Sequence, residues 1–212
     1  MLSSPILPCP SLDDAPAGAC GPACVSGFLR VHNEDSQGRQ QVEAFIANVY
    51  AQRFAARVTS FAPTLVSLCD ERGIVSAAGY RIATEPLYLE RYLSAPIEVM
   101  LAERAGARPA RESIVEIGHL AVRRPNEGRR LFPLLARHLA ERRLRWGVST
   151  LTVELRHLLT RMGIHSFALG PADPVCLGAA ASDWGDYYLH RPVVVAGQLS
   201  VALAQMTARG SR

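Results

Sequence analysis

The chain has 212 residues, of which 49% are apolar and 20% are charged, and its formal net charge is +4. This length and composition suit one soluble globular domain, with two domains as the upper limit. All 23 basic residues are arginine, because the sequence contains no lysine. The chain therefore lacks the residue that a Schiff-base enzyme or a Walker-type phosphate loop requires.

The first residues of the chain have the composition of a disordered segment. Residues 1–26 hold five prolines among many small residues, so we expect a lead-in ahead of a single domain over residues 27–212. The lead-in lacks the basic region of a signal peptide, and no apolar run is long enough for a transmembrane helix. The five cysteines form no Cys-x-x-Cys pair, so we expect no metal site and a reducing, cytoplasmic compartment.

The hydrophobic pattern of the remaining chain alternates between strand-like and helix-like segments. In the first half it predicts a strand, a helix, a hairpin closed by Asp-Glu-Arg-Gly and two short helices. Their expected bounds are residues 28–32, 37–54, 64–69 with 74–82, 87–93 and 97–104. In the second half strands and helices alternate, which indicates an α/β fold with a central mixed sheet flanked by helices. The expected strands are 114–122, 148–153, 167–169 and 193–196, and the expected helices are 131–144, 155–162 and 200–207.

The most informative stretch is residues 114–130, IVEIGHLAVRRPNEGRR. An apolar strand carries one acid, Glu116, and passes through a turn containing Gly128 into the next expected helix. A helix N-terminus offers free backbone N–H groups, and arginines beside it suit phosphate oxygens. The stretch therefore predicts a phosphate-bearing carrier next to a carboxylate base. A solvated basic face is the alternative, because a chain without lysine places arginine at every basic position.

The order of the expected elements resembles the acyltransferase fold of the GNAT N-acetyltransferases. In those enzymes the central strand ends at a loop patterned Arg/Gln-x-x-Gly-x-Gly/Ala, whose backbone N–H groups hold the pyrophosphate of coenzyme A. The matching stretch here is RRPNEG, in which Arg123 and Gly128 fit the pattern and Asn126 replaces the first glycine. The resemblance implies that Leu120 and Val122, just before the loop, present backbone groups to pantetheine.

A closer resemblance covers residues 28–205 and rests on FAPTLVSLCD, AAGYRIATEPLYLERYLSAPIE, IVEIGHLAV and WGVSTLTVELRHLLTRMGI. These segments resemble the thermostable hemolysin family, which is similar to the acyl-homoserine-lactone synthases, autoinducer synthases that take acyl groups from acyl carrier protein. Arg81 and Glu116 match a synthase arginine and glutamate, which implies substrate binding for the first and catalysis for the second. His119 stands where the synthases have an arginine. Their paired N-terminal aspartates have no counterpart, so S-adenosylmethionine is not implied as a substrate.

Glu116 lies in a strand expected to be buried, so its carboxyl group needs a partner or a raised pKa. As a general base it would take a proton from an amine or hydroxyl that attacks a thioester. The alternative is a structural ion pair with Arg81 or Arg111. Unless a bulge intervenes, strand alternation places His119 on the opposite face from Glu116, as a hydrogen-bonded core residue.

The remaining candidates are arginines near Gly128 and an aromatic segment. Bidentate arginine suits phosphate, so we expect Arg123, Arg129 and Arg130 to contact the carrier. The segment 183–188, DWGDYY, reads as a loop with a flexible glycine. It could line an acyl pocket, with Trp184 toward the substrate and Tyr187 or Tyr188 as the general acid. A packing loop is the alternative.

The favoured function is an acyltransferase that uses acyl-CoA or acyl carrier protein as donor, without a metal. The acceptor would be an amine or hydroxyl of a small molecule or lipid. A membrane-active, hemolytic protein without enzymatic activity is the alternative, although the sequence contains no long amphipathic membrane helix. A nucleic-acid module is disfavoured, because the arginines of residues 123–145 lie on several faces of one helix without interleaved aromatic residues.

Overall fold

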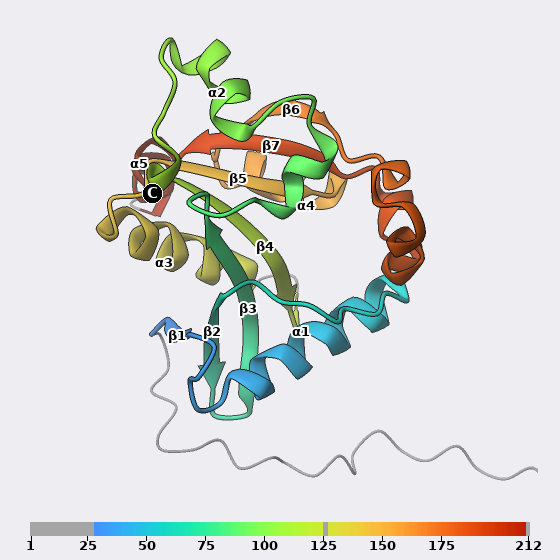
Figure 1. Cartoon of the computed structure of the whole chain (residues 1–212). Helices are drawn as coiled ribbons and strands as arrows, with labels where there is room; N and C mark the ends of the chain where they lie inside the picture. Colours follow the sequence, from blue (N-terminus) through green and yellow to red (C-terminus); the bar gives the residue numbers. More distant parts are fainter. Residues whose placement is uncertain (1–27, 125–126, 211–212) are drawn as a thin grey trace, which may run out of the picture.

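The computed structural model describes residues 28–124 and 127–210, and its centre is one seven-stranded sheet (Figure 1). The strands follow the order β1-β2-β3-β4-β5-β7-β6. Their bounds are β1 Arg30–His32, β2 Thr64–Asp70, β3 Gly73–Ile82, β4 Ile114–Val122, β5 Trp146–Leu151, β6 Phe167–Pro171 and β7 Val193–Gln198. β4 and β5 are parallel and every other neighbouring pair is antiparallel, so the predicted mixed sheet is confirmed.

Helices cover both faces of this sheet. The α-helices are α1 Arg39–Phe54, α2 Ile97–Ala105, α3 Gly128–Glu141, α4 Val153–Arg161 and α5 Leu199–Gly210. The described part of the chain also contains three 3-10 helices: η1 Tyr88–Tyr92, η2 Arg111–Ser113 and η3 Pro174–His190. α1 crosses β2, β3 and β4 on one face, whereas α3 lies on the other face with α5 beside it (Figure 1).

The alternation of side chains along β2 and β3 fills a separate core on each face. Toward α3, Val66 and Tyr80 pack with the leucines at the helix positions that face the sheet. Those leucines are Leu131, Leu135 and Leu139. Toward α1, Leu65 and Ala77 pack with a stripe spaced four residues apart, from Val42 to Phe54. Burial of each large aliphatic side chain contributes about 2 kcal/mol, so both helices are fixed against the central strands.

β4 has two irregularities that shape the molecule around it. It pairs with β5 only over Ile114–Glu116, after which the two strands separate. Farther on, the register against β3 shifts by one residue, and His119 in this bulge has a φ of 52°. Val115 and Ala121 are six residues apart, yet they lie in cores on opposite faces of the sheet. A regular strand would place both on one face, so the bulge reverses the alternation.

The expected elements are present, and α3 differs most at its start. The helix expected from residue 131 begins at Gly128, and Pro133 therefore lies inside it. Proline has no N–H to give to the preceding turn, so this turn of α3 lacks one backbone hydrogen bond.

The segment 183–188 was predicted to be a loop, and this prediction is wrong. It belongs to η3, whose helical turns are interrupted at Gly178 and Gly185, both with positive φ. Gly185 also packs so closely on the Phe54 carbonyl, at the end of α1, that a side chain there would clash. Glycine is used here for close approach and for backbone conformation.

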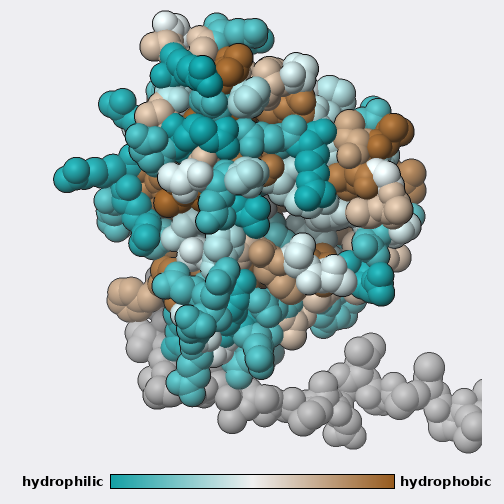
Figure 2. Space-filling model, viewed as in Figure 1, coloured by the Kyte–Doolittle hydropathy of each residue, from teal (hydrophilic) through white to brown (hydrophobic). Residues whose placement is uncertain are grey.

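The described residues contain no helix that is both long and apolar enough to cross a membrane. Figure 2 shows a mainly hydrophilic face, with apolar side chains gathered over η3 at the right. Val175 and Leu189 are the exposed large apolar residues of that segment. Residues 1–26, the expected lead-in, lie outside the described residues.

Candidate active site

A cavity of about 100 Å³ lies on the α1 side of the sheet, beside the point where β4 leaves β5. Its floor, formed by β3, β4 and β5, carries Arg81, Glu116, His119 and Thr150. The walls come from α1, η1, η3 and residues 60–62, and many of the side chains that form them are aromatic. We call this space the acceptor cavity. It unites five residues predicted from the sequence to act in the site: Arg81, Glu116, Leu120, Trp184 and Tyr187.

Glu116 is the last residue of β4 that pairs with β5, and its carboxyl group caps η1. The Tyr88 N–H donates to Oε2 at 2.7 Å and the Leu89 N–H donates to Oε1 at 3.0 Å. These backbone groups are its partners, in place of the ion pair considered from the sequence. Burial raises the pKa of the Glu116 carboxyl, although both N–H groups and Arg81 act in the opposite direction. Each oxygen retains a lone pair that can take a proton from a molecule in the cavity.

Arg81 lies directly opposite Glu116 in the β3–β4 ladder. The two side chains therefore leave the same face of the sheet, with Cβ atoms about 5 Å apart. They form no ion pair within 4.0 Å. The Arg81 Nη1 donates to the Pro86 carbonyl at 3.3 Å. Because a guanidinium has five N–H donors, Arg81 can still bind an anion in the cavity.

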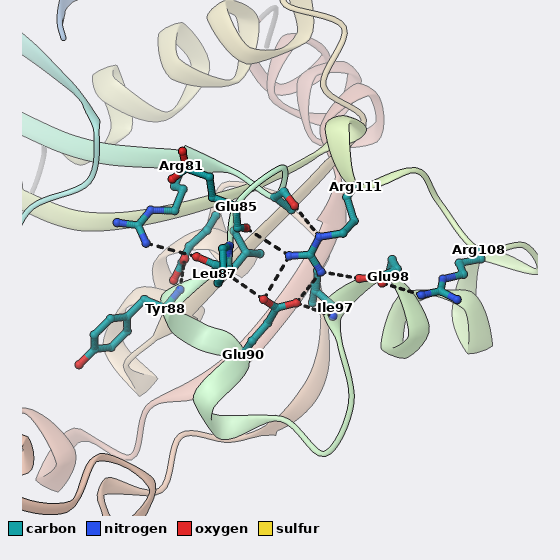
Figure 3. Close-up of polar contacts among 12 residues, drawn as sticks. Arg81, Glu85, Leu87, Tyr88, Glu90, Ile97, Glu98, Arg108 and Arg111 are labelled. Atoms are coloured by element: carbon teal, nitrogen blue, oxygen red, sulfur yellow. Dashed lines mark hydrogen bonds and ion pairs between the residues drawn. The ribbon is translucent and has the colours of Figure 1, made fainter. Parts of the chain in front are cut away.

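A cluster of charged side chains holds η1 above this floor (Figure 3). Glu90 accepts the backbone N–H groups at the starts of η1 and α2, each at 2.9 Å. Arg111 binds both Glu90 and Glu98, at 2.7 and 2.6 Å, and the exposed Arg108 also binds Glu98. Burial opposes ionisation of Glu90, but the bonds from Arg111 and the backbone keep its pKa below the usual range. The cluster fixes η1, and η1 supplies the two N–H groups that hold Glu116.

His119 faces the same cavity as Glu116, which corrects the expectation from strand alternation. That expectation applies to a strand without a bulge, and β4 has a bulge at this residue. Its Nε2 is 3.2 Å from the Ser60 carbonyl, and its ring lies against Phe61. Burial lowers the pKa of His119 to about 4, so the ring is neutral at pH 7. The Nδ1 atom is buried without a hydrogen-bond partner in the protein.

Two η3 residues predicted to act in the site, Trp184 and Tyr187, line the acceptor cavity. The Trp184 Nε1 donates to the Tyr88 hydroxyl at 3.2 Å, which ties η3 to η1. The Tyr187 hydroxyl donates to the Thr150 carbonyl at 3.2 Å, and its side chain is buried. Burial raises the pKa of Tyr187 well above its usual value, so the hydroxyl stays protonated. Tyr188, the other tyrosine considered, is not part of the cavity lining.

The separation of β4 from β5 begins directly after the pair Glu116–Val148. At the next position the Ser149 hydroxyl donates to the Ile117 carbonyl at 2.6 Å, in place of a backbone bond between the strands. The hydroxyl of Thr150, one residue farther, is buried without a protein partner. Beyond Ile117, the edge of β4 that faces β5 is not paired with that strand.

A second cavity, of about 330 Å³, extends from this fork to the start of α3. Four of the residues predicted to hold the carrier line it: Leu120, Val122, Arg123 and Gly128. Arg53 from α1, Arg124 beyond the end of β4 and Arg161 from α4 add positive charge, and Glu154 is the acidic residue of the lining. We call this space the arginine cavity.

Of three other residues predicted to contact the carrier, two do not line this cavity and one lies outside the described residues. Arg129 and Arg130 are exposed on α3 and do not line the arginine cavity. The helix begins at Gly128 and turns by about 100° per residue, so neighbouring positions face different directions. Asn126 lies outside the described residues, so its contact stays a prediction.

A third cavity, of about 90 Å³, lies on the other side of the fork among β5, β7, α3 and α5. Its lining is almost entirely apolar and includes Phe132, Leu135, Leu159, Val195, Leu199 and Met206. We call this space the apolar cavity. Leu120 lines all three cavities, and Ile117 lines both the acceptor and apolar cavities. The three spaces therefore meet where β4 leaves β5.

The sequence of this site and of the sheet around it matches a known protein family. Residues 32–203 match the family described as thermostable hemolysin, and this range is most of the chain. The chain belongs to the thermostable hemolysin family. Comparison with curated proteins gave no match.

Several solved structures share the fold of this thermostable hemolysin family member. TofI, in a ternary complex with an inhibitor and MTA, has a TM-score of 0.58 and 15% identity, covering 85% of this chain and 96% of TofI. FeeM, an N-acyl amino acid synthase from uncultured soil microbes, has a TM-score of 0.58 and 14% identity, covering 84% and 98%. The acyl-homoserine-lactone synthase LasI has a TM-score of 0.56 and 14% identity, covering 84% and 95%. These likenesses confirm the predicted GNAT-like fold.

The sequence of this thermostable hemolysin family member did not identify some of the residues that line the cavities. Tyr50 and Tyr88 resemble core residues of helical segments, and only the tertiary fold brings them to one cavity. Ser149 and Thr150 stand among apolar residues in an expected buried strand, so they resemble core residues in the sequence. Because buried hydroxyl groups need hydrogen-bond partners, hydroxyl side chains in such a strand could have indicated a site. Among the described residues, no group of three or more His, Cys, Asp or Glu side chains could hold a metal ion.

Proposed function

We propose that this protein is an acyltransferase, which moves an acyl group from a pantetheine thioester to an amine or hydroxyl acceptor. The observation that carries the proposal is the meeting of three cavities at Leu120, beside the fork between β4 and β5. One cavity is rich in arginine, one is apolar and one contains a carboxyl group. These characters correspond to the carrier phosphates, the acyl chain and the acceptor.

The arginine cavity suits the phosphates and the pantetheine arm of the donor. Arg123 and Arg124 can make charge-assisted bonds to phosphate oxygens, and the first turn of α3 adds backbone N–H groups. From there the edge of β4 that is not paired with β5 runs back to the fork. An amide-containing arm can pair with such an edge as an added strand does. This path would bring the thioester to Leu120.

The apolar cavity suits the acyl chain, because it opens at Ile117 and Leu120. Each methylene removed from water contributes about 0.8 kcal/mol. The predominantly apolar lining leaves few polar groups that would lose hydrogen bonds when a chain enters.

In the proposed reaction the acceptor nitrogen or oxygen attacks the thioester carbonyl carbon from the acceptor cavity. A new bond from nitrogen or oxygen to carbon forms, the carbon–sulfur bond breaks, and the thiolate leaves. Glu116 takes the proton of the nucleophile, directly or through one water, and this proton neutralises the thiolate. Because burial raises the pKa of Glu116, its carboxylate is a stronger base than an exposed glutamate.

Tyr187 was predicted as the general acid, and its environment favours a different role. A hydroxyl whose pKa is raised well above its usual value does not readily give its proton to a thiolate. We assign it hydrogen-bond donation, with the Thr150 carbonyl as its partner before the substrate binds.

Coenzyme A and acyl carrier protein present the same pantetheine arm, so both remain candidate donors. The exposed Arg129 and Arg130, close in sequence to the arginine cavity, would complement the acidic surface of a carrier protein. The acceptor is a small molecule or a lipid that fits between η1, η3 and the sheet.

The test is mass spectrometry of the purified protein incubated with acyl-CoA or acyl carrier protein and a mixture of amines, amino acids and alcohols. We expect an acylated acceptor and a free thiol in equal amounts. Absence of any acylated product with both donors would refute the proposal. Leakage of liposomes by the pure protein without a donor would instead support the membrane-active alternative.

A further inference from the structure

The charged groups of the acceptor cavity are one cation and one anion. Among the described residues that line it, Arg81 and Glu116 are the two with formal charge, and His119 is neutral at pH 7. The two lie directly opposite one another on β3 and β4 and yet form no ion pair within 4.0 Å. Glu116 is held by the Tyr88 and Leu89 N–H groups. A gap between opposite charges is therefore fixed on the floor of the cavity.

We propose that the acceptor is the zwitterion of an α-amino acid with a large apolar or aromatic side chain, which bridges Arg81 and Glu116. The inference rests on the proposed acyl transfer and names its substrate. The ammonium nitrogen and the carboxyl carbon of such a molecule are about 2.5 Å apart, because one carbon joins them. Arg81 binds the carboxylate through its remaining donors, and Glu116 faces the amine.

The walls of the acceptor cavity determine which amino-acid side chain the site accepts. Tyr50, Phe61, Tyr88 and Trp184 surround the floor, and the lining contains no further charged side chain among the described residues. A lysine or aspartate side chain would enter this space without a counter-charge, which is unfavourable in a partly buried site. A phenyl or isobutyl group would instead be removed from water against aromatic rings.

The arrangement also separates amino acids from the simple amines that share their side chains. An amine without a carboxylate leaves Arg81 without an anion, and a site built to bind a polar group rejects the analogue that lacks it. The ammonium group releases one proton to solvent before it attacks, and Glu116 is the carboxylate that can receive the second proton, which the attacking amine loses and which then neutralises the thiolate. The neutral ring of His119 adds no positive charge that would repel the ammonium group.

The experiment compares matched pairs of acceptors with octanoyl-CoA and octanoyl carrier protein as donors. Phenylalanine is paired with phenethylamine, and leucine with 3-methylbutylamine. We expect kcat/KM to be about 100-fold higher for the amino acid in each pair. We expect lysine and aspartate to be poor acceptors. Equal kcat/KM for an amino acid and its amine would overturn the inference while leaving acyl transfer intact.

The variant R81Q shows whether the preference comes from Arg81. It should reduce the ratio between phenylalanine and phenethylamine to below about 10-fold, and R81K should restore part of it. R91Q is the matched control, because the Arg91 guanidinium carbon lies 4.4 Å from the centre of the Tyr88 ring and Arg91 does not line the cavity. Retention of the full ratio in R81Q would refute the role of Arg81.

A binding measurement distinguishes failure of the inference from failure of the proposed function. Calorimetric titration of phenylalanine into the protein without a donor should give binding that weakens at least 10-fold in R81Q. Binding of this kind without product formation would refute acyl transfer and retain the amino-acid site. Product formed from alcohols or amines, with no phenylalanine binding, would refute the amino-acid site alone.

Discussion

The two halves of β4 have different surroundings, although they belong to one continuous strand. Ile114–Glu116 pairs with β3 on one side and β5 on the other, and both Ile114 and Val115 are fully buried. From Ile117 to Val122 the strand is paired with β3 alone, contains a bulge and borders three cavities. The first half stabilises the sheet, and the second half leaves backbone and side-chain groups free to bind other molecules. Glu116 lies at the boundary and is connected to both.

The largest expected effect is that of Glu116→Gln on the chemical step. If Glu116 is the base, kcat should fall by about 1000-fold, because general-base catalysis contributes on this scale. In the unchanged protein the rate should rise as the pH increases through the pKa of Glu116. Burial raises this pKa, so the rise should lie at a higher pH than for an exposed glutamate. The pH dependence of single-turnover rates would reveal this rise, and the variant should lack it.

Glu90→Gln separates catalysis by Glu116 from its capping of η1. Glu90 also accepts an N–H at the start of η1, but it does not line the acceptor cavity. We expect Glu90→Gln to lower the stability and to keep the pH-dependent rise in rate. If Glu116→Gln and Glu90→Gln lose activity equally, Glu116 acts by holding η1 in place. In that case its position between the two halves of β4 does not contribute to catalysis.

The next effect concerns the charged cluster ahead of the paired half of β4. Arg111→Met should reduce the free energy of unfolding by about 2 kcal/mol, because it leaves Glu90 and Glu98 partly buried without their shared cation. Urea denaturation measures this loss. Arg108→Gln removes a cation that is far more exposed from the same Glu98 and should cost below about 0.5 kcal/mol. Similar losses in the two variants would mean that burial of the cluster contributes little.

The regular part of the fold could be predicted from the sequence because it depends on local patterns. The hairpin of β2 and β3, the stripe of α1 and the apolar run of β4 each follow a period that the residues display. The position of Glu116 could be predicted for the same reason. Its partners could not, because the backbone N–H groups of Tyr88 and Leu89 come from a distant 3-10 turn.

The irregular part of the site could not be predicted, for reasons that differ between residues. His119 adopts a left-handed conformation that is uncommon for any residue except glycine, although histidine is enriched among the exceptions. Its identity is therefore only a weak sign of the bulge that turns it toward the cavity. The segment of Trp184 and Tyr187 contains a glycine that indicates a loop, whereas tertiary packing on α1 folds it into 3-10 turns. Arg129 is predicted to contact the carrier because it stands beside Gly128 at the presumed helix start, but the pattern does not show which way its side chain faces, and it is exposed outside the arginine cavity.

The arginines at the open end of β4 should affect the donor and not the acceptor. Arg124→Gln is expected to raise KM for acyl-CoA about 10-fold, since a charge-assisted bond to phosphate contributes about 1.5 kcal/mol or more. KM for acyl-pantetheine, which has no phosphate, should change little. Arg129→Gln removes an exposed charge of the same helix start outside the arginine cavity and should have the smaller effect on acyl-CoA. The reverse order would place the phosphates on the outer face of α3.

The smallest effect tests the fork itself. Ser149→Ala removes the bond of 2.6 Å to the Ile117 carbonyl, which holds β5 to β4 at the point of separation. The free energy of unfolding should fall by about 1 kcal/mol, the net contribution of one such bond. Ser113→Ala removes a solvent-exposed bond of similar length, from the Ser113 hydroxyl in η2 to the Ala110 carbonyl. Both variants lose one bond, but only the first changes the edge along which the pantetheine arm is proposed to lie. An increase of about 3-fold in donor KM for Ser149→Ala alone, equivalent to about 0.6 kcal/mol, would therefore link the fork to donor binding. An unchanged donor KM would limit Ser149 to joining the two strands.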